Sequence, residues 1–364
     1  MVEMLLVICI ITVLVALLFP AINAARNSAR RTQCQSNLRQ MGVGLLRNAE
    51  ANLGLFCSGV FYFLENRGLT QEGWVADLVG INIPFGQMTC PSNNSQLSET
   101  YIDLLEAAAV GDSCDIPRLG RPYELLPDGS RIPNPCRQIV TEGLAPNSAA
   151  RATVVEQQVF DAGYNTNYTA SWFLVRGDVL LDDNGNYKQK AAGCGSGNKS
   201  RNVTAGPLTR VRLDNGLYPA SAVPLLGDGA QTGRAISVNI GSLPAGSFGV
   251  ATMTGGPVRK SDMQPIPPFA DPTPEAGDAG WFKVWSQHVR QDYRAFAPLH
   301  GGSANILFGD GGVRSFNDTN GDGLLNTGFP VVGGFTSAEE EVSPEEMVNR
   351  WSLSAPRHYV LTTP

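Results

Sequence analysis

Residues 318–326 carry oxygen-bearing side chains at the spacing of a calcium-binding loop. The ligands offered at loop positions 1, 3, 5, 7 and 9 are Asp318, Asn320, Asp322, the main-chain carbonyl of Leu324, and Asn326. Position 12, which normally supplies a carboxylate, is Phe329, so Glu339 or Glu340 would have to complete the shell. The pattern therefore predicts either a weak site with calcium as cofactor or an Asx-rich turn that holds no ion.

A histidine and an Asp-Gly pair form the second set of candidate groups. Nine residues separate His300 from Asp310 and Gly311, and residues 304–308 among them predict a strand that enters a tight turn. His300 and Asp310 could form an acid/base pair or half of a metal site, but a histidine that ties a loop to the hairpin fits at least as well. No G-x-S-x-G motif, Ser/His/Asp set or phosphate-binding glycine loop is present. We therefore expect no catalytic residue and no enzyme activity.

Seven cysteines are the remaining reactive groups, and Cys9 lies in the apolar N-terminal run. None of the other six has C-x-x-C spacing or a nearby histidine pair, which argues against a zinc site. In an exported chain such cysteines form disulfides, although six allow fifteen pairings. We expect bridges among the four in Gly- and Pro-containing contexts, namely Cys90, Cys114, Cys136 and Cys194.

The first element that must position these groups is a long N-terminal helix. Residues 1–22 are an apolar run interrupted only by Glu3, Thr12 and Pro20. As a helix this run is about 33 Å long, close to the roughly 30 Å hydrocarbon thickness of a bilayer. Because the helical pattern continues through residues 23–52, we predict one helix of about 75 Å, transmembrane at first and then amphipathic. The arginines of the second part form a solvated face, and those nearest the span can contact anionic headgroups.

Glu3 is an ionisable residue inside this apolar helix. Such a carboxylate is unfavourable in a membrane unless it is paired, which makes it a candidate for a role in assembly. The alternative is that Glu3, close to the helix end, extends to the headgroups.

The rest of the chain, residues 53–364, predicts a globular domain with many loops. Its expected features are strands at 170–175 and 222–229, a turn at 182–186, an irregular insertion at 84–150, a Pro-rich excursion at 255–277, the hairpin after His300, and a helix that starts at Ser343. The fold class that follows is α+β, with a long helix followed by a β-rich and loop-rich head.

Composition excludes several classes of protein. The chain has 40 Gly, 24 Pro and 16% charged residues, which is too rich in turn formers and too poor in charge for a helical bundle. Its 43% of hydrophobic residues is too many for a wholly disordered protein. The net charge of −6 argues against nucleic acid as a partner.

The N-terminal features resemble those of type IV pilins and type II secretion pseudopilins. In these proteins a glutamate near the start of the mature chain is followed seventeen residues later by a helix-kinking proline, which is the separation of Glu3 and Pro20. The resemblance implies that the carboxylate neutralises the N-terminal amine of a neighbouring subunit during assembly. Pseudopilins of the major type also carry calcium near the C-terminus.

The whole chain resembles a bacterial family with prepilin-type N-termini, the domain of unknown function 1559. The segments that carry this likeness are the His-x9-Asp-Gly motif and residues 30–34 (RRTQC), 56–59 (FCSG), 73–79 (GWVADLV) and 90–93 (CPSN). Members of the family begin with a basic leader that ends in Gly before Phe-Thr-Leu, and Met1 stands at the third of these residues. Either the start codon lies further upstream or the chain bypasses prepilin peptidase; we expect the first, with such a leader encoded upstream and prepilin-type methylation after its removal.

The resemblance and the helix together imply a pilin-like structural subunit of a bacterial envelope filament or secretion apparatus. Its expected place is the inner membrane, crossed once, with the head in the periplasm or on the cell surface. The expected partners are membrane lipid and other pilin-like subunits bound through the helix. The alternative is a non-polymerising, membrane-tethered protein that binds a glycan or a protein, and a hydrolase that uses His300 and Asp310 is the third hypothesis.

Overall fold

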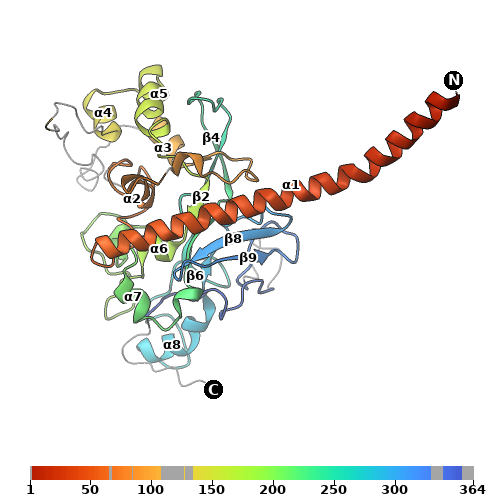
Figure 1. Ribbon diagram of the computed structural model, residues 1–364. Helices are drawn as coiled ribbons and strands as arrows, with labels where there is room; N and C mark the ends of the chain where they lie inside the picture. The colour runs from red at the N-terminus through yellow and green to blue at the C-terminus, as the bar shows by residue number, and fades with distance from the viewer. Residues whose placement is uncertain are drawn as a thin grey trace.

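The protein consists of one long helix and a head that packs against the second half of this helix (Figure 1). The computed structural model describes residues 2–64, 68–83, 85–107, 127, 134–328 and 339–354. Helix α1, Val2–Ala51, is continuous over 50 residues and includes Pro20. The prediction of a single long helix is therefore confirmed.

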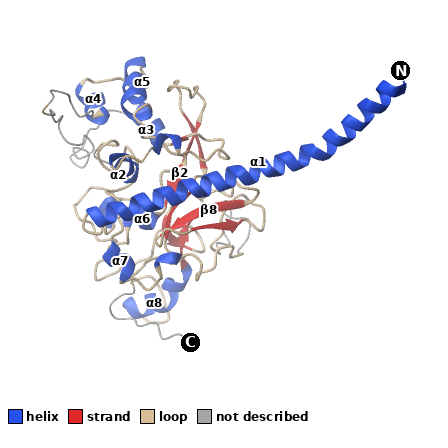
Figure 2. Ribbon diagram, in the orientation of Figure 1, coloured by secondary structure: helices blue, strands red, loops and turns tan. Residues whose placement is uncertain are grey.

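The head combines short helices with short strands, and loops connect them (Figure 2). Its helices are α2 (Trp74–Gly80), α3 (Thr100–Glu106), α4 (Pro135–Thr141), α5 (Ala149–Val155), the π-helical turn Glu156–Phe160, α6 (Trp172–Arg176), α7 (Arg210–Asp214) and α8 (Gly277–His288), with 3₁₀ turns at Phe85–Gln87, Arg201–Val203 and Ala220–Ala222. Its strands are β1 (Leu97–Ser98), β2 (Tyr168–Ala170), β3 (Pro224–Asp228), β4 (Gln231–Ala235), β5 (Phe248–Val250), β6 (Gly256–Arg259), β7 (Val289–Asp292), β8 (Ser303–Phe308) and β9 (Val313–Asn317).

The strands form three small sheets in the described part of the chain. The largest is antiparallel with the order β2-β3-β8-β9, and the others have the orders β1-β5-β4 and β6-β7. These sheets and the preceding helix place the chain in the α+β class. The description of the head as β-rich is too strong, because no strand among the described residues exceeds six residues and the head also contains the short helices α2 to α8.

The hairpin of β8 and β9 forms where the sequence predicts it. The two strands pair from Ser303 opposite Asn317 to Leu307 opposite Val313. Gly311 in the turn has φ of +81°, a conformation that glycine adopts without strain. The strand predicted at residues 222–229 is also present, as β3.

The second half of α1 lies against the central sheet and α2. Its buried apolar side chains recur every three or four positions, as one face of a helix requires, and are Cys34, Leu38, Met41, Leu45 and Ala49. Gly42 lies directly over β8, where a Cβ atom would be 2.7 Å from Leu307 Cδ1. Gln35 donates hydrogen bonds to Asn305 and Ser315 of the hairpin, each over 3.1 Å. The helix is thus joined to the sheet by both apolar and polar contacts.

Two predicted elements have a different structure. The apolar run at 170–175 was expected to be a strand, but β2 ends at Ala170, and Ser171 Oγ accepts the N–H of Leu174 as the N-cap of α6. Periodicity cannot separate a fully buried short helix from a buried strand. Ser343 starts only one turn, because the next N–H, that of Val348, donates to Ala222 O and joins the chain to the head instead of extending a helix.

The two irregular regions are more ordered than predicted in the residues that the structure describes. The Pro-rich segment 255–277 includes β6, and its Pro267 O accepts the Nε1–H of the fully buried Trp281. The insertion at 84–150 contains α3 and α4, whereas 108–126 and 128–133 lie outside the described residues.

Candidate functional site

The first half of α1 is an apolar surface that no described segment of the chain covers. Its large hydrophobic side chains are about half to three-quarters exposed, including Ile8 at 60%, Leu14 at 54% and Phe19 at 65%. The helix contains an 18-residue window with a mean hydropathy of 2.7, none of which is buried. This is one helix long and apolar enough to span a membrane, and it carries the head at one end (Figure 1). Since a signal sequence passes the same test, it is weak evidence for a single-pass anchor.

Glu3 and Pro20 lie at the two ends of this apolar surface. Glu3 is exposed in the first turn of α1, and Pro20 lies inside the helix near the point where the exposed arginines begin. The two residues have the positions along the helix that the sequence predicts, and their role in assembly stays a prediction.

A disulfide joins α1 to the head. Cys34 on the buried face of α1 is bonded to Cys90, in the loop after the 3₁₀ turn Phe85–Gln87, with a Cα–Cα distance of 5.0 Å. Both residues are fully buried. The loop is held by Asn167, whose side chain accepts the N–H of Cys90 over 2.8 Å and donates to Cys90 O over 3.0 Å.

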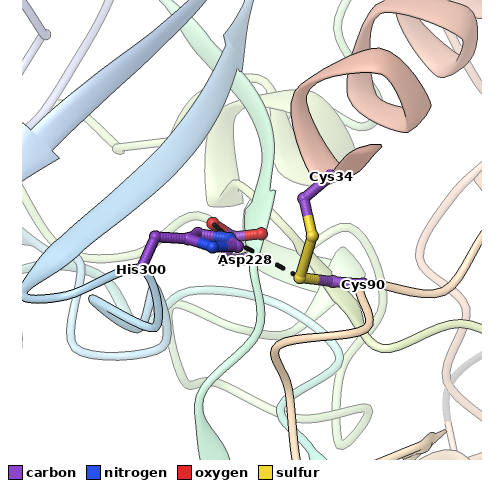
Figure 3. Close-up of side chains that lie close together, drawn as sticks. All are labelled: Cys34, Cys90, Asp228 and His300. Carbon is purple, nitrogen blue, oxygen red and sulfur yellow. Dashed lines mark hydrogen bonds and ion pairs between the residues drawn. A yellow bond between two sulfur atoms is a disulfide. The ribbon is translucent and has the colours of Figure 1, made fainter. Parts of the chain in front are cut away.

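His300 and Asp228 lie beside this disulfide (Figure 3). His300 Nε2 is 3.1 Å from Asp228 Oδ2 and 3.6 Å from Cys90 Sγ. The two side chains are 1% and 0% exposed. Asp228 ends β3, and His300 belongs to the loop that leads into β8, so the pairing of these strands brings them together.

The polar atoms of this cluster are only partly satisfied. Asp228 Oδ2 also accepts the main-chain N–H of Asn305 over 2.7 Å and its side-chain amide over 3.0 Å. By contrast, Asp228 Oδ1 and His300 Nδ1 are buried with no hydrogen-bond partner in the described part of the chain. One ligand atom each from Cys34, Cys90, Asp228 and His300 lies within 4.8 Å of the other three. Thiolate, imidazole and carboxylate are the donors of zinc sites, although sulfurs bonded to each other are poor ligands.

Sequence reasoning missed this cluster because its four residues come from four separate segments. The local tests for zinc, C-x-x-C spacing and a nearby histidine pair, detect ligands that are neighbours along the chain. Here the ligands are brought together by the packing of α1 on the sheet. The only signal in the sequence was the presence of Cys34 and Cys90 in the segments that resemble the prepilin-type family.

His300 and Asp310 do not meet. Asp310 lies in the exposed β8–β9 turn, where its Oδ1 accepts the N–H of Gly312 over 2.8 Å, at the opposite end of β8 from His300. The predicted role of His300 in tying a loop to the hairpin is consistent with its bond to Asp228, since Asp228 also holds Asn305 of β8.

The Asp318 loop has the turn geometry that its sequence predicts. Asp318 accepts the N–H groups of Gly321, Asp322 and Gly323. Glu341 supplies a carboxylate that bonds to the loop. Its Oε1 accepts the N–H of Thr319 over 2.6 Å, and its Oε2 accepts that of Asn326 over 2.9 Å. Hydrogen bonds alone therefore account for this fold of the loop, and calcium stays a prediction.

The predicted disulfide set needs correction. Cys90 is bonded, but to Cys34 of α1, which lies outside the expected set of four. Cys136 is a free, buried thiol, and burial raises its pKa to about 11, so it is not poised to react. Cys194 is disulfide-bonded, and Cys114 lies outside the described residues. Cys57 is also free, and burial raises its pKa.

The head also has an open pocket of about 740 Å³ next to β4, β5 and β7. Its lining includes Tyr62, Glu99, Gln231 and Arg294. Burial raises the pKa of Glu99, although its Oε1 accepts the N–H of Thr252. Trp281 is fully buried and packs on Phe269.

Comparisons with known proteins return no match for this chain: no family model, no curated protein and no solved structure is similar to it.

Proposed function

We propose that the protein is a pilin-like structural subunit, anchored in the inner membrane of a bacterium by α1 and assembled with other subunits through that helix. The observation that carries the proposal is the division of α1 into two halves. The second half is fixed to the head by a disulfide and a buried face, whereas the first half projects from the head with its apolar side chains exposed.

The uncovered half needs a partner because of its apolar area. Thirteen large hydrophobic side chains between Met4 and Ile22 are exposed. Burying a side chain of this kind contributes about 1.5–3 kcal/mol, so burying all of them would contribute a free energy on the order of 20 kcal/mol. Lipid or a bundle of equivalent helices would supply that cover. The disulfide suits a head in an oxidising compartment such as the periplasm or the cell surface.

Membrane anchoring is tested by placing a charge in the middle of the exposed apolar half of α1. A lysine or arginine at the centre of a spanning helix costs about 2.5–3.5 kcal/mol, so Leu14→Arg should shift the chain from the membrane pellet to the soluble or degraded fraction after alkaline extraction. Val43→Arg is the matched control, because Val43 is 68% exposed on the half of α1 that packs on the head. Equal retention of both variants in the pellet would contradict anchoring by this helix.

Assembly is tested at Glu3. In the proposed function the Glu3 carboxylate pairs with a cationic group of a neighbouring helix, because an unpaired charge is unfavourable in an apolar environment. Glu3→Ala should therefore abolish filaments in sheared fractions and crosslinked oligomers in membranes. Glu50→Ala, an exposed residue near the end of α1, is the control. Filaments and oligomers that persist unchanged in Glu3→Ala would show that this residue has no role in assembly.

Calcium is proposed as a ligand of the Asp318 loop. Asp318 and Glu341 supply carboxylates at one loop, and Asn320 and Asp322 add side-chain oxygens at the positions that calcium loops use. Binding is expected to be weak, because Glu341 already accepts main-chain N–H groups there. Calorimetry of the full chain in detergent that shows no heat at millimolar calcium would remove the ion from the proposal.

The second candidate function is a tethered binding protein that does not polymerise. The pocket beside β5 favours it, since about 740 Å³ lies within the usual size of ligand sites and its lining offers a tyrosine, an amide and charged groups. Electron microscopy of the native membrane assembly separates the two functions: filaments support the subunit, and isolated particles support the tethered binder.

A further inference from the structure

Two distances within the buried cluster are close to the edges of a tetrahedral zinc site, whereas the two sulfurs are bonded to each other. With Zn–S of about 2.3 Å, Zn–N of about 2.0–2.1 Å and Zn–O of about 2.0–2.2 Å, the S···N edge is about 3.5 Å and the N···O edge about 3.4 Å. The observed separations are 3.6 Å from Cys90 Sγ to His300 Nε2 and 3.1 Å from that nitrogen to Asp228 Oδ2. The fourth donor atom, from Cys34, is also within 4.8 Å of the others.

The cluster also contains polar atoms that the disulfide-bonded state leaves without partners. His300 Nδ1 and Asp228 Oδ1 are buried and have no hydrogen-bond partner among the described residues. Buried polar groups in native proteins are nearly always bonded, so two such atoms in one cluster call for an explanation. A second state of the cluster, in which the Asp228 carboxylate binds an additional group, gives Oδ1 a partner, whereas His300 Nδ1 keeps none among the described residues.

We propose that Cys34, Cys90, His300 and Asp228 bind one zinc ion when the Cys34–Cys90 bond is reduced. A dithiol or phosphine reductant supplies two electrons, two protons are taken up, and the S–S bond is replaced by two thiols. Zinc then binds two thiolates as both thiol protons leave to solvent. The proton on His300 Nε2 moves to Nδ1, which has no partner among the described residues, so that the Nε2 lone pair faces the ion.

The formal charge of the cluster is the same in both states. A disulfide with a neutral imidazole and a carboxylate carries −1, and a zinc ion with two thiolates, the same imidazole and the same carboxylate also carries −1. Burial of additional net charge is the main electrostatic obstacle to placing an ion in a protein interior. Exchange between these two states buries none. The two sulfurs move apart to about 3.8 Å, the S···S edge of the same tetrahedron.

Zinc and the disulfide are alternatives at one joint between α1 and the head. Each links Cys34 of α1 to the loop of Cys90, and the metal adds links to β3 and to the loop before β8. The reduced chain thus keeps a crosslink at this joint.

The proposal is tested with the full chain in detergent, reduced by a phosphine and titrated with cobalt(II) as the spectroscopic probe. We expect one equivalent to bind, with the visible bands of tetrahedral cobalt and sulfur-to-metal charge transfer, and no binding by the oxidised chain. X-ray absorption of the zinc-loaded wild type should show two sulfur and two nitrogen or oxygen neighbours. His300→Ala should weaken cobalt binding by at least about 100-fold, since loss of even an outer-shell partner weakens metal binding 10–100-fold.

Cys136→Ala is the matched control, because it removes a buried free thiol outside the cluster and should leave cobalt binding unchanged. A reduced chain with native near-ultraviolet circular dichroism and no tetrahedral cobalt spectrum would overturn the proposal. Loss of binding in Cys136→Ala with retention in His300→Ala would overturn it as well. If reduction unfolds the head, zinc must restore the native circular dichroism signal, and failure to restore it counts against the site.

Discussion

The disulfide between Cys34 and Cys90 should be a major source of stability for the joint of α1 and the head. It closes a loop with a sequence separation of 56 residues. The chain-entropy relation for such a loop gives about 14 cal/mol/K, or about 4 kcal/mol at 25 °C. The double variant Cys34→Ala with Cys90→Ala should therefore lower the free energy of unfolding by roughly that amount, plus a smaller loss from the two truncated side chains.

The measurement is urea unfolding of the oxidised full chain in detergent, with a chelator present to exclude metal. Tryptophan fluorescence reports on the head, because Trp74, Trp172 and Trp281 are almost fully buried there. Cys136→Ala is the control, since it removes a buried sulfur that is not bonded to another.

The single variants make the test sharper. Cys34→Ala and Cys90→Ala should each lose nearly the whole effect, because either substitution removes the bridge, and the double variant should lose little more. Additive effects of the two single substitutions, or a double variant within about 1 kcal/mol of Cys136→Ala, would refute the assignment of this stability to the bridge.

Three further outcomes follow from particular contacts. Burial raises the pKa of Asp178 to about 6 despite the hydrogen bond from Ser352 and the nearby Arg212. Because the native state binds the proton more tightly than the unfolded state, the free energy of unfolding should fall as the pH rises from about 4 to about 6. Urea unfolding of Asp178→Asn across this pH range should lack that fall. Ser171→Ala, which removes the N-cap of α6, should lower the free energy of unfolding by about 1 kcal/mol or more, and an unchanged unfolding midpoint would contradict the cap. Asp318→Ala should abolish calcium heat in calorimetry, whereas Asp182→Ala, in a comparable Asx turn, should not.

Local patterns predicted the elements whose residues interact with near neighbours. The apolar and then amphipathic sequence predicted all of α1. The spacing and polarity of neighbouring side chains are enough to indicate a helix, without any contact with the head. Asp310 and Gly311 predicted the β8–β9 turn, and Asp318 the loop after it, for the same reason. The hairpin and the long helix are decided within a few tens of residues.

Other outcomes depended on contacts with distant segments. The apolar run after Ala170 became helix α6 and not a strand, because it is buried on every side and Ser171 caps it. Ser343 began a single turn because Val348 bonds to Ala222. In both cases the local sequence is compatible with two structures, and burial against the rest of the head selects one.

Period, polarity and turn chemistry are local properties, so the residues alone were enough to predict a long membrane-type helix before a loop-rich head with a C-terminal hairpin. The packing of distant segments selected the cysteine that Cys90 meets, the pairing of His300 with Asp228 and not with Asp310, and the contact of Glu341 with the Asp318 loop. The physical reason is that hydrogen bonds, disulfides and metal bonds act over a few ångströms. Residues far apart in the chain come within that range only after α1 packs on the sheet and the strands pair.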